Sequence, residues 1–405
     1  MSESQLTDFD VLVNGAGLVG SCCALLLARS GIHVAILDKD RPSKEVDHDP
    51  IRVSALNHAS QNILENLCVW PELAWDKSTA FERIEVWDAL SNGAISFDAA
   101  TAGLSHLGHI VANNSLCTAL HQALGHCAEA VVRFGENLVD IESSDSCITV
   151  TLAGGEKLRA GLLIGADGAH SKVRQLAGIA HDQSSYNHTA IVATVTPEKP
   201  HGACARQRFL PTGPLAFLPL AENQCSIVWS ASTAEAERVL SLNDSAFATE
   251  LAQAFEKRLG KIKAVSERKA FALTRRHASA YIGERIALIG DAAHTVHPLA
   301  GLGANQGLAD AAALAEVTND ALSKNRDIGT RSVLRRYERW RRGENALVLQ
   351  VMDGFHNLFG SEDLTITGLR GMGLKLTDQA PLLKNALMQH AIGLAGDIPR
   401  LARPL

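Results

Sequence analysis

The stretch DVLVNGAGLVGSCCALLLARSGIHVAILD, residues 10–38, decides the fold of this chain. Its apolar runs Asp10–Asn14 and His33–Leu37 predict two buried strands, because each is short and rich in Val, Leu and Ile. The longer apolar segment Leu18–Ser30 between them predicts a helix. Strand, turn, helix and strand in this order predict a βαβ unit with a parallel sheet.

The turn of this unit carries Gly15, Gly17 and Gly20, which fit the pattern G-x-G-x-x-G. In such a turn the glycines permit a sharp bend, the approach of a pyrophosphate, and close packing of helix on strand. Asp38 ends the second strand, where a carboxylate is placed to bind a ribose hydroxyl. The unit therefore predicts a dinucleotide site, and by itself it fits NAD or FAD equally well.

Two further strands end in glycine turns. Leu162–Ile164 leads into Gly165-Ala166-Asp167-Gly168, and Arg285–Ile289 leads into GDAAHTVHPLAGLGANQG, residues 290–307. The glycines at 290, 301, 303 and 307 indicate a loop whose backbone passes close to a ligand, and Pro298 stiffens it. The helix predicted over Ala304–Ala321 would turn its positive end toward an electron-rich group.

Between these segments the sequence contains short apolar runs that are separated by turn residues. This pattern predicts an inserted, mostly antiparallel sheet. The chain then divides into a discontinuous cofactor domain over 1–80, 106–182 and 272–345, a substrate domain over 81–105 and 183–271, and a C-terminal helical region over 346–405. The strands expected in the inserted sheet are Ile84–Trp87, Ala94–Phe97, Ile191–Val195, Ala205–Leu210, Ala216–Leu220 and Ser226–Ser230.

Composition excludes several classes of protein. The 405 residues are 46% hydrophobic, so a large core is expected, and the formal net charge of -6 argues against a nucleic-acid partner. The one basic run, Leu334–Arg342, is interpreted as a solvated helix face, with a lipid-headgroup patch as the alternative. The eight cysteines form no C-x-x-C pair, so we expect free thiols in a reducing compartment.

Other signals concern metals, membranes and partners. His294 and His297 have no carboxylate or cysteine companions, so no metal site is predicted. No leader and no apolar run of about 20 residues is apparent, which predicts a cytoplasmic protein. An apolar stripe from Leu382 to Ile392 is expected to dock on the chain's own body, and contact with a partner or with lipid is the alternative.

Several of these motifs resemble those of a known family. GADGAHSKVR at 165–174 and GDAAH at 290–294 resemble the DG and GD motifs of the class A FAD-dependent aromatic hydroxylases. Further segments resemble the ring hydroxylases of ubiquinone synthesis, and the resemblance runs over nearly the whole chain: DPIRVSALN at 49–57, SHLGHIV at 105–111, FLPTGPLAFLPL at 209–220 and HTVHPLAG at 294–301. Residues 85–88, 95–98 and 200–207 are most similar to the branch that hydroxylates a 2-polyprenylphenol at ring carbon 5.

The resemblance implies a fold and a reaction. The fold would be a Rossmann-like FAD-binding domain of the para-hydroxybenzoate hydroxylase type, with the inserted antiparallel substrate sheet and C-terminal helices. FAD would be the cofactor, NAD(P)H the donor and O2 the co-substrate. A polyprenylated phenol would receive the oxygen by way of a flavin C4a-hydroperoxide. Contact with the inner membrane, a homo-oligomer and association with other ubiquinone-synthesis enzymes stay open as partners.

Alternatives to this reaction remain. Hydroxylation at another ring position, a flavin reductase or halogenase on the same fold, and a non-catalytic FAD-stabilised scaffold subunit are all compatible with the motifs. The halogenase motif W-x-W-x-I-P is absent, since Trp70 and Trp75 lie in the unrelated segment WPELAW.

The resemblance also implies roles for single residues. The carbonyl of Pro298 would face the reactive edge of the flavin. Turn-capping is the alternative role for Asp167 and Asp291, and ordinary core packing is the alternative for the pocket residues. The chain departs from the family at Leu302 and Gln306, where Gln and Leu are common. Cofactor contacts are expected from Gly15, Gly17, Gly20, Asp38, Arg52, Asn113, Asp167, Asp291, Gly301, Gly303 and Asn305, and pocket contacts from Phe209, Phe217 and Leu218.

Overall fold

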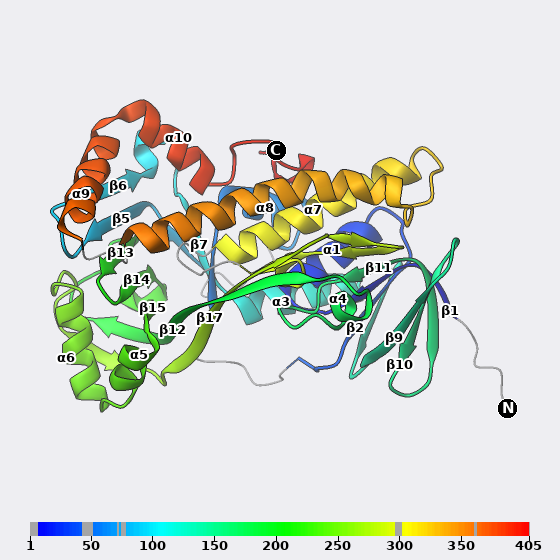
Figure 1. Ribbon diagram of the computed structural model, residues 1–405, viewed down its shortest axis with the longest axis horizontal. Helices are drawn as coiled ribbons and strands as arrows, with labels where there is room; N and C mark the ends of the chain where they lie inside the picture. The colour runs from blue at the N-terminus through cyan, green and yellow to red at the C-terminus, as the bar shows by residue number, and fades with distance from the viewer. Residues whose placement is uncertain are drawn as a thin grey trace.

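A computed structural model describes residues 7–42, 52–70, 73, 78–295, 302–359 and 363–404. Two large sheets lie end to end along the molecule, and long helices run beside both of them (Figure 1). The first sheet contains β1 (Thr7–Asn14), β2 (Val34–Asp38), β8 (Ala130–Phe134), β9 (Leu138–Ser143), β10 (Ile148–Leu152), β11 (Lys157–Gly165), β18 (Ile282–Gly283) and β19 (Ile286–Leu288). Strands β19, β11, β1, β2 and β8 are parallel neighbours, as the βαβ unit predicts.

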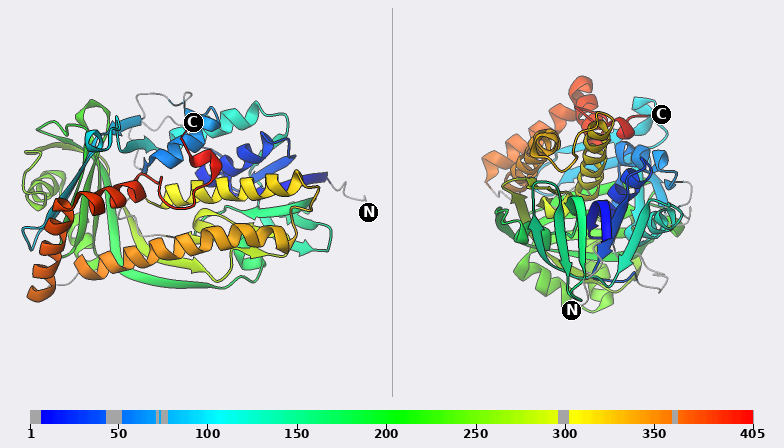
Figure 2. Two further views of the ribbon diagram at one scale, coloured as in Figure 1. Left: turned by 90° about the horizontal axis from the view of Figure 1, so that it is seen from above. Right: turned by 90° about the vertical axis from the view of Figure 1, so that its right-hand side faces the viewer.

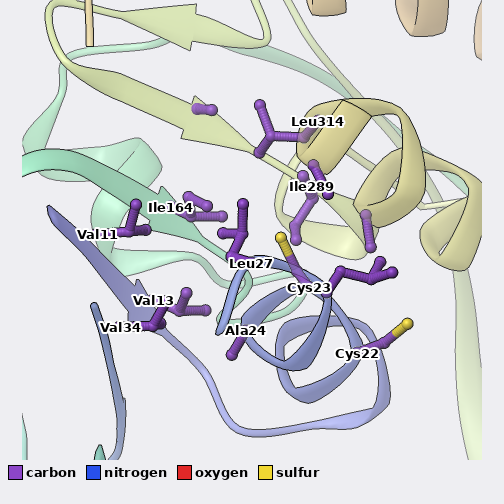
Figure 3. Packing of buried hydrophobic residues seen from close by; sticks show 14 of the residues in the cluster. Val11, Val13, Cys22, Cys23, Ala24, Leu27, Val34, Ile164, Ile289 and Leu314 are labelled. Carbon is purple, nitrogen blue, oxygen red and sulfur yellow. The ribbon is translucent and has the colours of Figure 1, made fainter. Parts of the chain in front are cut away.

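The helix of this unit, α1 (Leu18–Ala28), is buried on nearly all sides because its sequence is apolar throughout. It packs between the parallel sheet and two further helices, α3 (Asn113–Gly125) and α7 (Leu302–Leu322). Figure 3 shows side chains of β1, β2, β11, α1 and α7 meeting in this one core. Helix α7 begins at Leu302, two residues before the predicted start.

The second sheet is mostly antiparallel, as predicted. Its printed order is β20-β17-β12-β15-β14-β13-β5-β6, with β16 paired to β12, and only the pair β13 and β5 is parallel. Its strands are β5 (Arg83–Asp88), β6 (Ala94–Asp98), β12 (His181–Pro197), β13 (Cys204–Leu210), β14 (Gly213–Pro219), β15 (Cys225–Ser232), β16 (Ile262–Val265), β17 (Lys269–Ala278) and β20 (His294–Thr295). Helices α5 (Thr233–Leu240) and α6 (Asp244–Ala254) cover one face of this sheet.

The two sheets are joined by secondary structure rather than by flexible linkers. Strands β12 and β17 are long and pair with each other across the predicted domain boundaries at 182 and 271. The GD segment leaves the first sheet after β19, and its strand β20 then pairs with β17 of the second sheet. This segment therefore lies at the junction of the two sheets, which is where a cofactor can meet a substrate.

A small third sheet contains β3 (Val53–Leu56), β4 (Ser78–Phe81) and β7 (Gly108–Ala112). Helix α2 (His58–Asn66) follows β3, and α4 (Lys172–Leu176) follows β11. Two views turned from the first show the first sheet at one end of the molecule and α9 and α10 at the other (Figure 2).

The C-terminal region contains α8 (Arg331–Phe359), α9 (Leu364–Gln379) and α10 (Pro381–Ala391). Helix α8 crosses the predicted boundary at 345 without interruption. The prediction that the stripe Leu382–Ile392 docks on the chain's own body is wrong for most of its residues. Met388 and Ile392 are buried, but Leu382 is 88% exposed, because a single helix can turn only one side toward the sheet.

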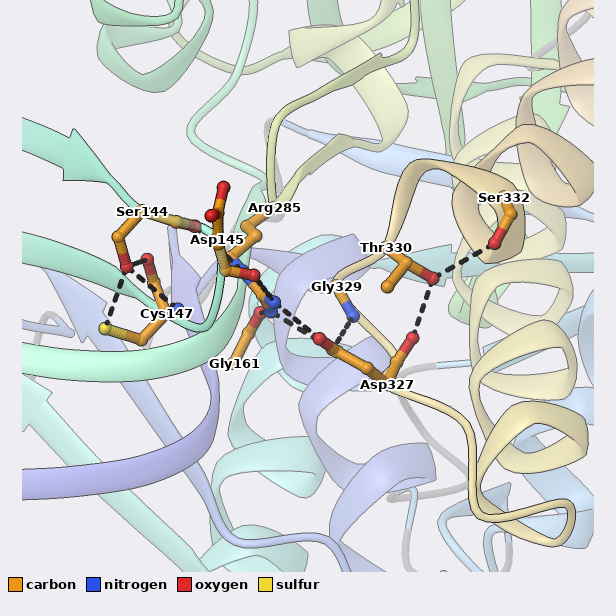
Figure 4. A network of polar contacts seen from close by, with 9 residues as sticks. All are labelled: Ser144, Asp145, Cys147, Gly161, Arg285, Asp327, Gly329, Thr330 and Ser332. Atoms are coloured by element: carbon orange, nitrogen blue, oxygen red, sulfur yellow. Dashed lines mark hydrogen bonds and ion pairs between the residues drawn. The ribbon is translucent and has the colours of Figure 1, made fainter.

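At the other end of the molecule, Arg285 fixes the loop between α7 and α8. This buried guanidinium donates to the carbonyl oxygen of Gly161 at 2.9 Å and forms an ion pair with Asp327. Figure 4 shows the same arginine reaching the carbonyl of Asp145 in the β9–β10 turn. The helices beside the first sheet are therefore anchored to it far from the glycine turns.

Candidate functional site

The geometry of the turn after β1 requires glycine at two of its three glycine positions. Gly15 has φ +109°, and a Cβ there would lie 2.4 Å from the carbonyl oxygen of Ala166. A Cβ on Gly20 would lie 1.9 Å from the carbonyl oxygen of Gly15. A Cβ on Gly17 would meet no atom within 4 Å, so this position borders open space. The structure thus separates two packing glycines from one that faces outward.

The first turn of α1 is left without a side-chain cap. Gly17 is the N-cap and offers no side-chain acceptor, so the first backbone N–H groups of the helix are available to an anion. Asp38 lies beside the turn, where its Oδ2 accepts a hydrogen bond from the N–H of Ala16 at 2.7 Å. An open glycine, free helix N–H groups and an adjacent carboxylate fit the pyrophosphate and ribose of a dinucleotide.

His121 of α3 contacts this turn, a contact that the sequence did not predict. Its Nε2 lies 2.8 Å from the carbonyl oxygen of Ala16 and 3.1 Å from Oγ of Ser21. A histidine in the middle of α3 carries no pattern that would have indicated this contact.

The carboxylate of Asp167 accepts hydrogen bonds from other groups of the protein. Its Oδ2 accepts hydrogen bonds from Asn14 Nδ2 at 3.0 Å, from the N–H of Lys172 at 2.7 Å and from the N–H of Val173 at 3.1 Å. The carboxylate therefore caps α4 and ties the DG turn to the end of β1. A cofactor contact from Asp167 stays a prediction.

Arg174, the last residue of the DG motif, connects that motif to the GD motif. It is buried and donates to the carbonyl oxygen of Ala292 at 2.7 Å and to that of Ala169 at 2.9 Å. Burial lowers its pKa, and the charge of Arg276 lowers it further against the opposing effect of Asp167. The two motifs are thus held in one fixed arrangement.

Asp291 lies at the junction in an unusual environment. Its side chain is accessible to solvent, yet desolvation by the surrounding protein raises the pKa of its carboxyl group, against the charges of His294, Arg52 and Arg276. The side chain thus contacts solvent although protein packs densely around the carboxyl group. Such a carboxyl is placed to hydrogen-bond a ligand hydroxyl.

A buried ionic network lies directly beneath the GD turn. Asp310 of α7 accepts hydrogen bonds from His294 Nε2 at 2.6 Å, from the N–H of Gly290 at 3.1 Å and from Arg341 Nε at 2.8 Å. Burial by itself would raise the pKa of this carboxyl, but the charges of His294 and Arg341 hold it at about 2. The network fixes the backbone of the turn to α7 and α8.

This network corrects one expectation and explains one departure from the family. Arg341 belongs to the run interpreted as a solvated helix face, yet it is 2% exposed, because α8 turns this side toward Asp310. Its Nη2 also donates to Gln306 Oε1 at 2.8 Å, so the unusual Gln306 has a partner within the protein. The signal missed in the sequence was the lone acid Asp310 inside the apolar run LADAAALA.

Gly290 and Gly307 also differ from expectation. A Cβ on Gly307 would lie 2.4 Å from Val19 Cγ2, and a Cβ on Gly290 would lie 3.2 Å from Val19 Cγ1. These two glycines therefore make room for Val19 of α1, and a close approach of their backbone to a ligand stays a prediction. A Cβ on Gly303, in contrast, would meet no atom of the described residues within 4 Å.

Asn305 joins α7 to the β3–α2 segment. Its Oδ1 accepts hydrogen bonds from the N–H of Asn57 at 3.1 Å and from Ser60 Oγ at 2.7 Å, and its Nδ2 donates to the carbonyl oxygen of Ala55 at 2.8 Å. These contacts show it holding the protein together at the site. Contact with a flavin ring stays a prediction.

Asn113 and Arg52 come together beside this junction. The N–H of Asn113 donates to the carbonyl oxygen of Arg52 at 3.0 Å, and its Oδ1 accepts a hydrogen bond from Ser54 at 2.7 Å. The guanidinium of Arg52 lies 5.4 Å from the centre of the Phe271 ring on β17, so it bridges the small sheet and the substrate sheet. The expected residues Pro298 and Gly301 lie outside the described residues.

Of the three expected pocket residues, Phe217 lies apart from the other two, while pocket contacts from Phe209 and Leu218 stay a prediction. Phe217 is buried under α6 and stacks on Phe255 with ring centres 4.0 Å apart. Phe209 stacks on Phe359 at 3.7 Å, and Leu218 packs in a third cluster. Alternation along β14 places Phe217 and Leu218 on opposite faces, so they cannot share a ligand.

An accessible row crosses the face of the substrate sheet that is turned away from α6. Strand register aligns Val192, Val228, Ala216 and Gln207 on β12, β15, β14 and β13, and all four are half-buried. On this face the rows to either side belong to buried clusters that include α10 and α8. The amide of Gln207 forms no hydrogen bond to the described residues. The row is therefore an apolar strip with one unused polar group.

Two further searches of the described residues concern metals and membranes. Within those residues, no three His, Cys, Asp or Glu side chains are grouped to hold a metal ion. None of the described helices combines the length and apolarity needed to cross a bilayer.

Comparisons with known proteins show the family of this chain. A family model described as "FAD binding domain" matches residues 8–350. The chain is 36% identical to 3-demethoxyubiquinol 3-hydroxylase of Escherichia coli, over 95% of this chain and 98% of that protein. It is 35% identical to the ubiquinone hydroxylase UbiL of Rhodospirillum rubrum, over 97% and 92%. It is 32% identical to the human ubiquinone biosynthesis monooxygenase COQ6, over 95% and 92%.

Solved structures show the same fold. PqsL of Pseudomonas aeruginosa, a probable FAD-dependent monooxygenase, superposes with a TM-score of 0.77 at 22% identity, over 92% of this chain and 100% of that chain. The p-nitrophenol 4-monooxygenase PnpA of Pseudomonas putida superposes with a TM-score of 0.78 at 17% identity, over 96% and 99%. The predicted fold class is confirmed. The chain belongs to the FAD binding domain family and, within it, to the FAD-dependent monooxygenases of ubiquinone biosynthesis.

Proposed function

We propose that this enzyme hydroxylates the aromatic ring of a polyprenylated phenol at ring carbon 5, with NAD(P)H as electron donor and O2 as co-substrate. Reduced FAD, when bound, would activate O2 so that one of its oxygen atoms can pass to the ring. The observation that carries the proposal is the accessible row Val192–Val228–Ala216–Gln207, which offers an apolar surface to a prenylated ring.

The residues of the chain would share the remaining tasks. The free N–H groups of α1, with Asp38, bind the nucleotide end of the cofactor. Asp291 takes a ribityl hydroxyl, and the first turn of α7 at Gly303 stabilises negative charge on the ring of the cofactor. Pro298, whose carbonyl is expected at the reactive edge, remains part of the proposal by resemblance alone.

Gln207 would orient the substrate. Its amide lies on the apolar row without a hydrogen-bond partner among the residues that the structure describes, so a phenol oxygen can satisfy it. A single hydrogen bond in an apolar site fixes which ring carbon faces the cofactor, because it removes rotation of the ring about the prenyl axis. Gln207 is therefore the residue from which we expect control of regiochemistry.

A variant at this position tests the assignment. Gln207→Leu should keep the FAD content, lower kcat/KM roughly tenfold, and mix the positions of the new hydroxyl. Gln253→Leu, on the exposed side of α6, is the matched control and should change neither. An unaltered rate and product distribution in Gln207→Leu would remove this residue from the site.

A second ring position is the competing function, because the relative from Escherichia coli is named as a 3-hydroxylase. Mass spectrometry of the quinone intermediate that accumulates when the protein is removed from cells separates the two. An intermediate lacking only the ring-5 hydroxyl supports the proposal, and one already hydroxylated there supports another position. Purified protein that holds FAD but never couples a donor to hydroxylation would indicate the scaffold alternative.

A further inference from the structure

One buried arginine beside the GD turn leaves most of its hydrogen-bond donors unused. Arg276 of β17 is 8% exposed, and its Nε donates to Oε1 of Gln183 at 3.0 Å. Its two terminal nitrogens have no hydrogen-bond or ion-pair partner among the residues that the structure describes. Burial of an unpaired guanidinium costs free energy unless an acceptor from water or a ligand reaches it. This side chain is therefore a candidate for contact with a ligand.

The strands around Arg276 place a second unused polar group beside it. Arg276 lies opposite Gln183 of β12 on one side and opposite Thr295 of β20 on the other. Directly opposed residues on neighbouring strands share a face, so the three side chains form a row across the junction of the two sheets. The Oγ1 of Thr295 is buried and likewise lacks a hydrogen-bond partner within the described part of the chain. The row thus carries unused donors on two adjacent strands.

The charges near this row favour an anion. Burial raises the pKa of the Asp291 carboxyl, although the charges of Arg52 and Arg276 oppose the shift. Burial lowers the pKa of the Arg174 guanidinium, and the charge of Arg276 lowers it further, against that of Asp167. Arg276 is therefore near both glycine motifs, yet no ion pair among the described residues joins it to Asp291. The three guanidiniums outnumber the two carboxylates, so positive charge is in excess here.

We propose that Arg276 and Thr295 form a binding site for a phosphate group of a nucleotide. The terminal nitrogens of a guanidinium form a planar fork that matches two phosphate oxygens, and the hydrogen bond from Nε to Gln183 fixes the orientation of this fork. The hydroxyl of Thr295 can donate to a third oxygen. A third donor and the excess of positive charge favour a phosphate over a carboxylate, which has two oxygens and a single charge.

Two nucleotides carry such a group, FAD and NAD(P)H, and the assignment rests on the proposed function only for their identity. The first turn of α1 and Asp38 are already placed for the pyrophosphate and ribose of FAD. Arg276 and Thr295 lie on β17 and β20, which take no part in that turn. We therefore expect the phosphate at Arg276 to come from the nicotinamide donor.

Calorimetric titration of the FAD-loaded protein with NAD⁺ and NADP⁺ tests this source, because the oxidised nucleotides carry the same phosphates and do not reduce the flavin. Arg276→Met should weaken binding at least about tenfold, since a charge-assisted contact to two oxygens is lost. Arg276→Lys keeps the charge without the fork and should recover part of the affinity. Thr295→Val removes one neutral hydrogen bond and should have a smaller effect. Inorganic phosphate should compete with the nucleotides in the parent protein.

The matched control is Arg275→Met, one residue earlier on β17. Its side chain points to the opposite face, where it forms an ion pair with Asp353 at 3.1 Å. This variant should bind NAD⁺ and NADP⁺ like the parent protein. Unchanged binding of all nucleotides, flavin nucleotides included, by Arg276→Met would overturn the proposal.

Fluorescence titration of stripped protein with riboflavin, FMN and FAD tests the other source. A loss in Arg276→Met for FMN and FAD, with riboflavin unaffected, would keep the phosphate site and assign it to the cofactor. An equal loss for riboflavin, which has no phosphate, would place Arg276 at the ring or the ribityl chain and reject a phosphate site.

Hydroxylation of a phenol, measured separately, distinguishes this inference from the proposed function. In Arg276→Met, a raised KM for the donor with kcat close to that of the parent supports the donor as the source. Nucleotide binding that depends on Arg276 in a protein that never hydroxylates a phenol rejects only the proposed function. Hydroxylation in a protein whose nucleotide binding ignores Arg276 rejects only the phosphate site.

Discussion

The glycine turn at Gly15–Gly20 and the helix pair α9–α10 show two ways in which an apolar pattern becomes structure. Around this turn, backbone contacts fix Gly15 and Gly20, and around the GD turn the buried Asp310 has charged partners on β20 and α8. In the helix pair, a few contacts fix the orientation and leave a row of leucines outside. The difference teaches that the buried positions of a turn tolerate little change of residue, while the exposed positions of a helix tolerate more.

The largest expected effect is at Asp310, beneath the GD turn at Gly290. Asp310→Ala removes the carboxylate that pairs with both His294 and Arg341 in the core, so the free energy of unfolding should fall by about 3–5 kcal/mol. Chemical denaturation followed by fluorescence measures it. Asp320→Ala, which removes only exposed ion pairs with Arg336 and Arg400, should cost less than about 1 kcal/mol. Equal losses in both variants would mean that the network does not anchor the turn.

The next largest effects are expected for substitutions within the glycine turn at Gly15–Gly20. Gly20→Ala forces a Cβ against the carbonyl of Gly15 and should destabilise the protein by about 1–3 kcal/mol. Gly17→Ala meets no protein atom, so stability without cofactor should stay within about 0.5 kcal/mol while FAD affinity falls roughly tenfold. Thermal unfolding of stripped protein and FAD titration measure the two. Tight FAD binding by Gly17→Ala would place the pyrophosphate elsewhere.

Gly303 offers the same test at the ring end of the site. Gly303→Val places a side chain in open space at the start of α7, and we expect weaker FAD binding or release of peroxide instead of hydroxylated product. The measurement is peroxide formed per NAD(P)H consumed. Full coupling in this variant would exclude Gly303 from the space of the flavin ring.

A smaller effect concerns pH. Burial, with the neighbouring His106 and His58, lowers the pKa of His109 from 6.5 to about 4. The folded protein then binds fewer protons than the unfolded chain in this window, so stability is full above pH 6.5 and falls as the pH drops toward 4, by on the order of 2 kcal/mol.

His109→Phe should flatten the part of this slope that the residue contributes. Denaturation series between pH 7 and pH 4 compare it with the parent protein. A slope unchanged in His109→Phe would assign the pH dependence to other groups.

The smallest effect on stability is expected at Leu382 of α10. Leu382→Ser alters an 88% exposed side chain and should change the free energy of unfolding by less than about 0.5 kcal/mol. A loss larger than about 2 kcal/mol would mean that this leucine is covered, and would erase the contrast with the glycine turn.

The sequence by itself determined the dinucleotide frame, the antiparallel insertion and the order of the three glycine motifs. These follow from short-range rules, because a turn of six residues between a strand and a helix has few solutions, and apolar periodicity distinguishes strand from helix. Family resemblance then selected FAD over NAD. Gly17 and Asp38 lie at the turn as expected, and their contacts with the cofactor remain proposals.

Only the tertiary structure decided which residues meet across the chain. Arg341 and Asp310 are neighbours because α7 and α8 lie side by side, which no local pattern encodes. Phe217 and Leu218 face opposite ways because the register of β14 selects a side for each, and the leucines of α10 stay exposed because Met388 takes the side that faces the core. Residue type determines what can be buried, but the packing of distant elements determines what is buried.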